Sequence, residues 1–159
     1  MTILAIDPGT HLGFTVPGVP GAKGRARAFA LKGTGKIRMF TPAKTERYES
    51  LIRDAFALQV KAEVIPYTGP VEMHVKAYYA IPKSKPKWWK AMAQSETLAV
   101  TKKPDMDNIV KVVKDALNNI AYRDDSQVFR DIGEKFYSER PRVEVQIWFF
   151  PECVRPTQS

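Results

Sequence analysis

Residues 102–135 read KKPDMDNIVKVVKDALNNIAYRDDSQVFRDIGEK. The stretch contains an Asp-x-Asp-Asn sequence starting at Asp105, a helical pattern, and an Asp-Asp pair at 124–125. A helix turns about 100° per residue, which places Asp107, Lys111, Lys114 and Asn118 on one stripe. The opposite side is apolar and consists of Ile109, Val112, Val113, Ala116, Leu117 and Ile120. The pattern predicts a helix that packs on a sheet and presents Asp107 and Lys111 to solvent or substrate.

The two acidic clusters flank this helix and have two interpretations. If the chain reverses after Asp125 and returns along a helix of roughly 20 Å, the carboxylates of Asp105, Asp107 and Asp125 converge. Such a site would suit one or two Mg²⁺ ions beside a phosphate, with Lys111 balancing phosphate charge. Alternatively, Asp105 caps the helix, Lys111 forms i,i+4 pairs, and Asp124-Asp125 is a turn. The spacing leaves both interpretations open.

The composition indicates one intracellular domain. A chain of 159 residues can bury a core without disulfides. Cys153 is alone, which excludes an intramolecular disulfide and a thiol-paired zinc site. The apolar N-terminal run is five residues long and lacks a basic start, and no segment approaches the roughly 20 apolar residues of a membrane span. We therefore expect a cytoplasmic protein.

The positive charge favours a polyanionic partner. Twenty-five Lys and Arg against 17 Asp and Glu give a net charge of +8, which also fits a merely solvated basic surface. The basic residues nevertheless form three clusters, which indicate a track for nucleic acid phosphates. We expect DNA contacts from Lys23, Arg25, Arg27, Lys83, Lys85, Lys87, Lys102 and Lys103. Trp88 and Trp89 are candidates for stacking on unpaired bases, or for the core.

Periodicity predicts an α+β fold in the order β-β-α-β-α-α-β-β, with a small mixed sheet packed against helices. Residues 14–20 and 27–40 are expected to form an irregular hairpin. A helix should begin at Thr41-Pro42, with Thr41 as its cap, and end before Pro66. Its predicted buried face comprises Tyr48, Leu51, Ile52, Ala55, Leu58, Gln59 and Ala62.

The second half of the chain is more regular. Residues 71–80 alternate, so Val71, Met73, Val75, Ala77 and Tyr79 should face the core, while Glu72, His74, Lys76 and Tyr78 face outward. A short helix is predicted over 87–94. Strands are predicted at 127–137 and 142–150, and the tight connection between them predicts an antiparallel pair.

The stretch KKPDMDNIVKVVKDALNNIAYRDDSQV resembles the signature of the RusA family of Holliday-junction resolvases. The resemblance extends to FTVPGVPGAKGRARA, FTPAKTERYE and AIPKSKPKWWK, and so covers about residues 14–150. Relatives commonly carry Gly where this chain has Asn119. Because Asn tolerates left-handed backbone geometry, we expect the helix-ending role to be kept.

The resemblance implies that Asp105, Asp107 and Asp125 bind metal as catalytic carboxylates and that Lys111 is a catalytic lysine. It implies a Mg²⁺-dependent homodimer that resolves four-way branched DNA by symmetric paired nicks, in recombination and repair, encoded by a phage or prophage. It also implies a RusA-like domain over 14–150, an N-terminal extension over 1–13 and a C-terminal tail over 151–159.

Three other interpretations come from the same residues. ILAIDPGTHLG, with Asp7, resembles the first strand of RuvC-type resolvases, but the RusA-like pattern starts directly after it, which favours a strand and turn or a fused extension. A catalytically inactive branched-DNA-binding protein would use the carboxylates structurally. A phosphohydrolase of small substrates would lack the steep salt dependence of DNA binding.

Overall fold

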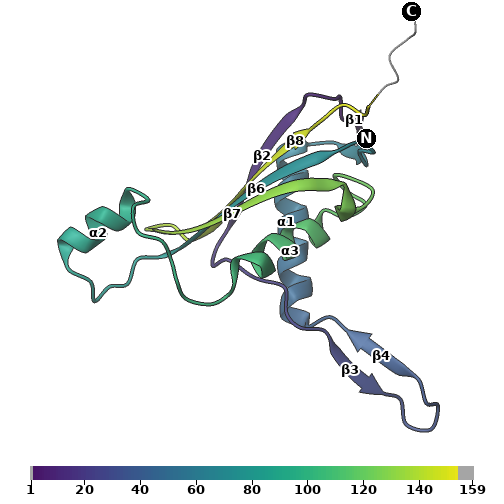
Figure 1. Ribbon diagram of the computed structural model, residues 1–159, viewed down its shortest axis with the longest axis horizontal. Coiled ribbons are helices and arrows are strands. Elements are labelled where there is room, and N and C mark those ends of the chain that lie inside the picture. The colour runs from purple at the N-terminus through teal and green to yellow at the C-terminus, as the bar shows by residue number, and fades with distance from the viewer. Residues whose placement is uncertain (1, 154–159) are drawn as a thin grey trace, which may run out of the picture.

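The computed structural model, which describes residues 2–153, is built around a four-stranded sheet (Figure 1). The α+β class and the expected order of elements are confirmed, with additional short strands. In chain order the elements are β1 (Ile3–Ala5), β2 (His11–Pro17), β3 (Arg27–Ala30), β4 (Ile37–Phe40), α1 (Ala43–Val60), β5 (Glu63–Ile65), β6 (Val71–Ala80), α2 (Lys87–Gln94), α3 (Met106–Ala116), a 3₁₀ turn (Asp125–Gln127), β7 (Val128–Ser138) and β8 (Arg142–Phe149).

The main sheet has the strand order β2-β8-β6-β7. β8 is antiparallel to both β2 and β6, whereas β7 is parallel to β6. The predicted pairing of the last two strands is therefore wrong, because β6 lies between them. β6 and β8 have regularly buried side chains and suit the centre, whereas most of β7 is exposed or half-buried and suits an edge. The long crossover through α2 and α3 permits the parallel pair.

Helices α1 and α3 cover one face of this sheet, as Figure 1 shows. The predicted apolar face of α3 is buried, and Ile109, Val112 and Val113 have no exposed surface. They join a core that includes Val71, Met73, Val75 and Ala77 of β6 and Val143, Val145 and Ile147 of β8. α3 ends at Ala116, shorter than expected, and Asn119 beyond it has the expected left-handed φ of 60°.

The opposite face of β6 departs from the predicted alternation. Tyr78 and Glu72 were expected to face outward, but both are buried. The guanidinium of Arg142 lies 3.9 Å from the centroid of the Tyr78 ring, and the Tyr78 hydroxyl donates a hydrogen bond to Glu96. Polar neighbours therefore cover this face without a helical layer, which strand periodicity alone does not reveal.

α1 shows two differences from its prediction. Pro42 occupies the N-cap position and no side-chain hydrogen bond caps the helix, so the capping role expected for Thr41 is wrong. Leu51 and Leu58 are 50% and 76% exposed. The buried side is instead rotated toward Phe56, whose ring packs edge-on against Phe14 at a centroid separation of 5.7 Å.

The N-terminal strands also differ from the expected hairpin. β2 begins at His11 and pairs with β8, while residues 27–40 form the hairpin β3–β4 by themselves. The domain boundary expected at residue 14 falls inside β2, and β1 pairs with β5. Of the expected tail, residues 154–159 lie outside the described residues. Within residues 2–153, no helix is both long and apolar enough to cross a membrane.

Candidate active site

Helix α3 presents three of the four residues of the predicted polar stripe to an open pocket of about 440 Å³; Asn118 lies beyond the end of the helix and does not line this pocket. Asp107, Lys111 and Lys114 line it from the helix, because residues three and four apart share one helical face. Asp125, from the turn before β7, and Asp131, on β7, also line it. The reversal of the chain after α3 thus brings together three carboxylates and two ammonium groups that are up to 24 residues apart.

Asp105 lines a neighbouring pocket of about 500 Å³ together with Arg25, Lys103 and Asn108. It occupies the N-cap position of α3, yet its side chain makes no capping hydrogen bond. The structural interpretation of Asp105 as a helix cap is therefore not supported. Its carboxylate lies beside basic groups, in a different pocket from Asp107 and Asp125.

The lysines of α3 do not form the i,i+4 ion pairs that the spacing permits. Among residues 2–153, no ion pair joins Lys111 to Asp107 or to Asp115. Asp115 instead binds Lys23 at 2.8 Å, and Lys114 binds Asp131 at 2.9 Å. Asp107 and Lys111 are both exposed. They are accordingly available to a substrate.

The loop that carries Asp125 is held by Gln127. The Gln127 amide nitrogen donates to the carbonyl oxygens of Tyr67 and Gly69 at 2.8 and 2.9 Å, and its oxygen accepts from the Asp124 N–H at 2.9 Å. The Asp124 side chain completes a capping box. The Gln of the Asp-Asp-x-Gln sequence therefore anchors the turn to the end of the sheet, and Asp124 has a structural role.

The pKa values of the two adjacent carboxyls of this turn are shifted in opposite directions. Burial raises the pKa of Asp125, and its hydrogen bond with Asp124 and the negative charges of Asp115 and Asp124 raise it further. The Ser126 hydroxyl, which donates to Asp124 at 2.7 Å, lowers the pKa of that exposed carboxyl. Asp125 is thus a carboxylate crowded by negative charge, an environment that a cation would relieve.

β7 runs back along α3 and returns the chain to the start of the helix. At Gly133 the backbone comes so close that a Cβ there would lie 2.6 Å from Met106 Cγ. Lys114 and Asp115, which follow Asp107 by about 10 Å along the helix axis, act electrostatically on the Asp125 carboxyl. Asp125 thus lies by the second half of α3 and shares a pocket with Asp107, whereas Asp105 lines a different pocket.

The oxygen donors of this pocket suit a hard cation. Mg²⁺ commonly binds proteins through one or two carboxylates and keeps its other positions for water and substrate phosphate. Asp107 and Asp125 supply such a pair on an open pocket. Within residues 2–153, however, no three His, Cys, Asp or Glu side chains lie close enough together to hold an ion. The donor chemistry fits Mg²⁺ without forming a closed cage.

The predicted basic residues fall into two kinds. Lys23 binds Glu49 and Asp115, each at 2.8 Å; burial lowers its pKa, but these carboxylates outweigh that effect and raise it. The others are exposed: Arg25, Arg27, Lys83, Lys85, Lys87, Lys102 and Lys103. Lys85 lies 5.0 Å from the centroid of the Trp89 ring, while Trp88 is 65% exposed.

Sequence reasoning did not identify Asp131. Its exposed position on β7, opposite Lys114, depends on how the returning strand lies against α3. A signal was present, because Asp131 follows Asp125 by six residues on a strand predicted to run back along the helix. Without the register between strand and helix, that signal could not single out Asp131 from its neighbours.

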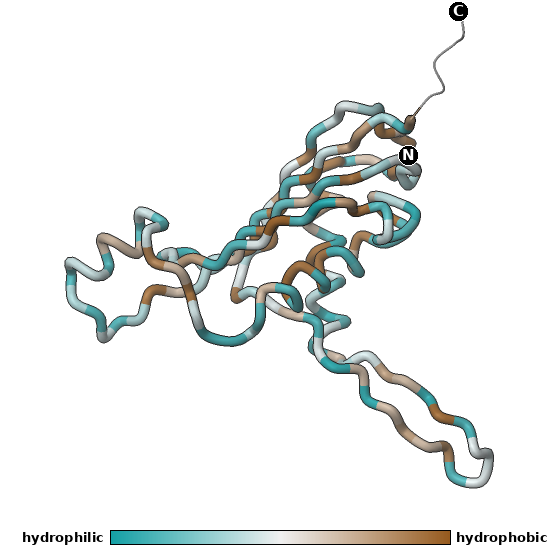
Figure 2. Tube along the Cα trace, in the orientation of Figure 1, coloured by the Kyte–Doolittle hydropathy of each residue, from teal (hydrophilic) through white to brown (hydrophobic). Residues whose placement is uncertain are grey.

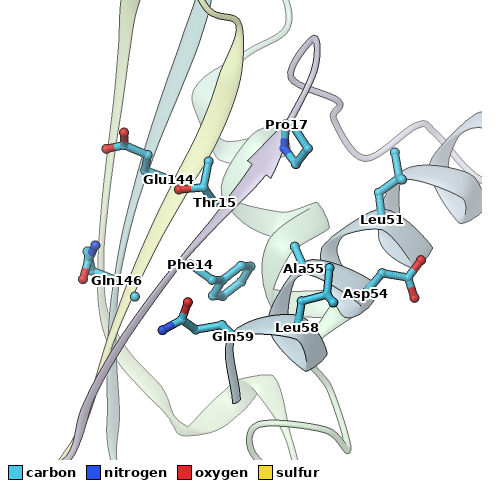
Figure 3. Close-up of a pocket in the computed structure, with 11 residues that line it drawn as sticks. Phe14, Thr15, Pro17, Leu51, Asp54, Ala55, Leu58, Gln59, Glu144 and Gln146 are labelled. Carbon is cyan, nitrogen blue, oxygen red and sulfur yellow. The ribbon is translucent and has the colours of Figure 1, made fainter. Parts of the chain in front are cut away.

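A larger cavity of about 800 Å³ lies between β2 and α1. Figure 3 shows its two carboxylates, Asp54 on α1 and Glu144 on β8, on opposite sides of Phe14. The exposed Leu51 and Leu58 also line it. Its polar groups do not converge, so size alone does not identify the candidate active site.

Comparison with known proteins agrees with the geometry. The family described as Endodeoxyribonuclease RusA matches residues 17–148. An uncharacterized protein of Bacillus subtilis (strain 168), YqaN, is 48% identical over 136 residues, which cover 84% of this chain and 93% of that protein. The crossover junction endodeoxyribonuclease rusA of Lactococcus phage r1t is 27% identical over 117 residues, covering 73% of this chain and 81% of the phage protein. The chain therefore belongs to the RusA endodeoxyribonuclease family.

Proposed function

We propose that this protein is a Mg²⁺-dependent, structure-selective DNA endonuclease that resolves four-way junctions by symmetric paired nicks. The observation that carries the proposal is the shared pocket of Asp107, Lys111 and Asp125, in a chain of the RusA family. The phage relative, named a crossover junction endodeoxyribonuclease, supports the choice of substrate.

Asp107 and Asp125 are the proposed metal ligands, and Asp105 is proposed as a third from the adjoining pocket. Bound Mg²⁺ would supply activation of water and neutralisation of charge on the phosphate. The exposed Lys111 ammonium, one turn from Asp107, is placed to attract the scissile phosphate and offset its developing charge. Lys114 is held by Asp131 and contributes less free charge.

The charge distribution supports DNA as the substrate. Figure 1 shows α3 between two projections, the β3–β4 hairpin and the α2 segment. Basic residues occupy both projections, and Lys102 and Lys103 precede α3. A duplex laid across these clusters would release counterions at each, so affinity should fall steeply with salt.

The proposed functional unit is a homodimer of the domain expected over residues 14–150, which also takes in the start of β2 from His11, with the residues before it as an extension and 151–159 as a tail. A four-way junction has approximate two-fold symmetry, and a two-fold dimer would place one active site on each of two opposed strands. Paired nicks follow from that symmetry.

A second candidate is a branched-DNA-binding protein without catalysis. One observation favours it: within the described residues no three-carboxylate cluster is assembled, and Asp105 lines a different pocket from Asp107 and Asp125. Against it, carboxylates beside a DNA track repel phosphates unless a cation intervenes.

The deciding experiment incubates the protein with a labelled synthetic four-way junction and with a linear duplex of matched sequence. Mg²⁺ should give paired nicks in opposed strands of the junction, EDTA should abolish them, and the duplex should stay intact. Equal cutting of the duplex would contradict structure selectivity. Tight junction binding without cutting under Mg²⁺ or Mn²⁺ would establish the second candidate.

A further inference from the structure

The β3–β4 hairpin projects from the body of the protein and contributes nothing to its core. All eight of its strand residues are exposed, including Phe29 at 54%, Ile37 at 71% and Met39 at 62%. Figures 1 and 2 show a ribbon with apolar segments that no other element covers. A two-stranded ribbon is marginally stable in water by itself. An apolar ribbon held in solvent therefore indicates a contact surface for a partner.

The strand register divides the ribbon into two different faces. Arg27 pairs with Phe40, and Phe29 pairs with Arg38. Because directly paired residues and residues two apart share a face, these four form one face, called here the Arg–Phe face. Its Phe rings lie 5.7 Å apart edge to face, and the Arg38 guanidinium lies 5.4 Å from the Phe40 centroid. The other face consists of Ala28, Ala30, Ile37 and Met39.

Charge identifies the partner of this surface. Residues 25–38 contain Arg25, Arg27, Lys32, Lys36 and Arg38 and no Asp or Glu. A second copy of the ribbon would bring like charges together, whereas a polyanion complements them. Arginine with exposed aromatic rings suits nucleic acid in particular, because guanidinium groups bind phosphates and rings stack on unpaired bases.

The base of the ribbon is fixed beside the candidate active site. The Lys23 N–H donates to the Asn108 carbonyl at 2.9 Å, and the Gly24 N–H donates to Thr45 Oγ1 at 3.0 Å. Glycine is required at 24, since a Cβ would lie 2.9 Å from both Pro42 Cγ and Thr45 Oγ1. The ion pairs of Lys23 tie the same segment to α1 and α3. DNA held by the ribbon is thereby led toward Asp105 and α3.

We propose that the β3–β4 ribbon is a DNA-binding arm whose Arg–Phe face stacks Phe29 and Phe40 on unpaired bases at a branch point and binds the flanking phosphates through Arg27 and Arg38. The proposal rests on the proposed function insofar as the substrate is branched DNA. It assigns the preference for branched over linear DNA to the arm, since only a branch point offers unstacked bases.

The test measures binding without cleavage, in EDTA, by fluorescence anisotropy of a synthetic four-way junction and of a matched duplex. The first variant is Phe29→Ala with Phe40→Ala, and the second is Arg27→Ala with Arg38→Ala. The matched control is Ile37→Ala with Met39→Ala on the opposite face. Because none of these side chains is in the core, circular dichroism melts should match wild type.

The Phe pair should weaken junction binding by about tenfold or more and duplex binding by much less, since stacking contributes about 1–3 kcal/mol per base. The Arg pair should weaken both and reduce the salt dependence. The control should bind like wild type. With 2-aminopurine at the branch point, wild type should quench its fluorescence more strongly than the Phe variant.

Junction affinity of the Phe variant within twofold of wild type would overturn the proposal, as would a larger loss in the control. A variant that converts a dimer to a monomer in sedimentation would also overturn it, because the ribbon would then bind a second copy. Wild type that binds through the Arg–Phe face but never cuts would contradict the nuclease and leave the arm established.

Discussion

Gln127 connects the fold to the candidate active site, and the effect of its replacement on the free energy of unfolding can be predicted from its hydrogen bonds. Gln127→Glu preserves size and the oxygen that accepts from Asp124, but it replaces the amide donor with a second acceptor. Two hydrogen bonds, to the Tyr67 and Gly69 carbonyls at 2.8 and 2.9 Å, are lost. At about 1 kcal/mol each, the free energy of unfolding should fall by about 2 kcal/mol at pH 7.

The pH dependence gives this prediction a distinctive sign. Two facing carbonyls disfavour the charged form of the introduced carboxyl, so its pKa should be raised in the folded state. A raised pKa contributes stability that is fully present below the unfolded value, about 4.3, and is lost as pH rises through the folded value. The difference in the free energy of unfolding between Gln127→Glu and wild type should therefore become smaller as the pH falls toward 4.

Urea unfolding followed by circular dichroism at several pH values measures both effects. The control is Ser126→Ala, which removes an exposed hydrogen bond to Asp124 and should change stability by less than about 0.5 kcal/mol. Junction nicking by Gln127→Glu should also slow, because the turn bearing Asp125 loses its anchor. Stability within about 0.5 kcal/mol of wild type at pH 7 would refute the anchoring role.

Close packing of β7 on α3 requires glycine at 133, because a Cβ would lie 2.6 Å from Met106 Cγ. Gly133→Ala should lower the free energy of unfolding by about 1 kcal/mol in urea unfolding. The double variant with Met106→Ala should lose less stability than the sum of the two single variants, because the shortened side chain makes room for the new Cβ. Losses that simply add would show that the two side chains do not clash. The Tyr78 hydroxyl is the main cause of the lowered pKa of Glu96, with Lys76 adding to it. A lowered carboxyl pKa stabilises the fold above the ordinary value, and that stability is lost as pH falls. Tyr78→Phe should therefore raise the Glu96 pKa in an NMR titration and reduce stability at pH 7 more than at pH 3, whereas an unchanged titration would contradict this pairing.

The helix–sheet packing was largely predictable because it depends on one-dimensional periodicity. The 3.6-residue repeat of α3 correctly identified its buried face, and α2 was found at its predicted bounds. Period-two alternation likewise located β6 and β8, and β7 was found within one residue of its predicted bounds. These patterns depend only on residues that are close in sequence, so they can be recognised without knowing which elements become neighbours.

The order of strands could not be predicted in the same way. β7 and β8 are joined by a short connection, yet β6 lies between them, because the two most deeply buried strands occupy the centre. The exposure of Leu51 and Leu58 has a similar origin: α1 is rotated by the contact of Phe56 with Phe14, a residue of distant sequence.

The candidate active site was predictable in composition more than in arrangement. Asp107, Lys111 and Asp125 line one pocket, whereas Asp105 lines another beside Arg25 and Lys103. Which carboxylates share a pocket depends on how far the chain travels before β7 turns back. The turn that Gln127 holds sets that distance. The arrangement of the carboxylates could therefore be known only from the three-dimensional structure.

Single-turnover cleavage of a synthetic four-way junction by Asp107→Asn tests the proposed metal-dependent active site most directly. The matched control is Asp54→Asn, which removes a carboxylate from the separate cavity beside α1. Loss of a residue that merely supports a metal ligand lowers metal affinity or activity by about 10- to 100-fold. Loss of a ligand itself should therefore slow cleavage at least about a hundredfold. We expect Asp107→Asn to bind the junction at least as tightly as wild type in EDTA and to leave it uncut in Mg²⁺, while Asp54→Asn cuts normally. Cleavage by Asp107→Asn at the wild-type rate would contradict the assignment of the active site.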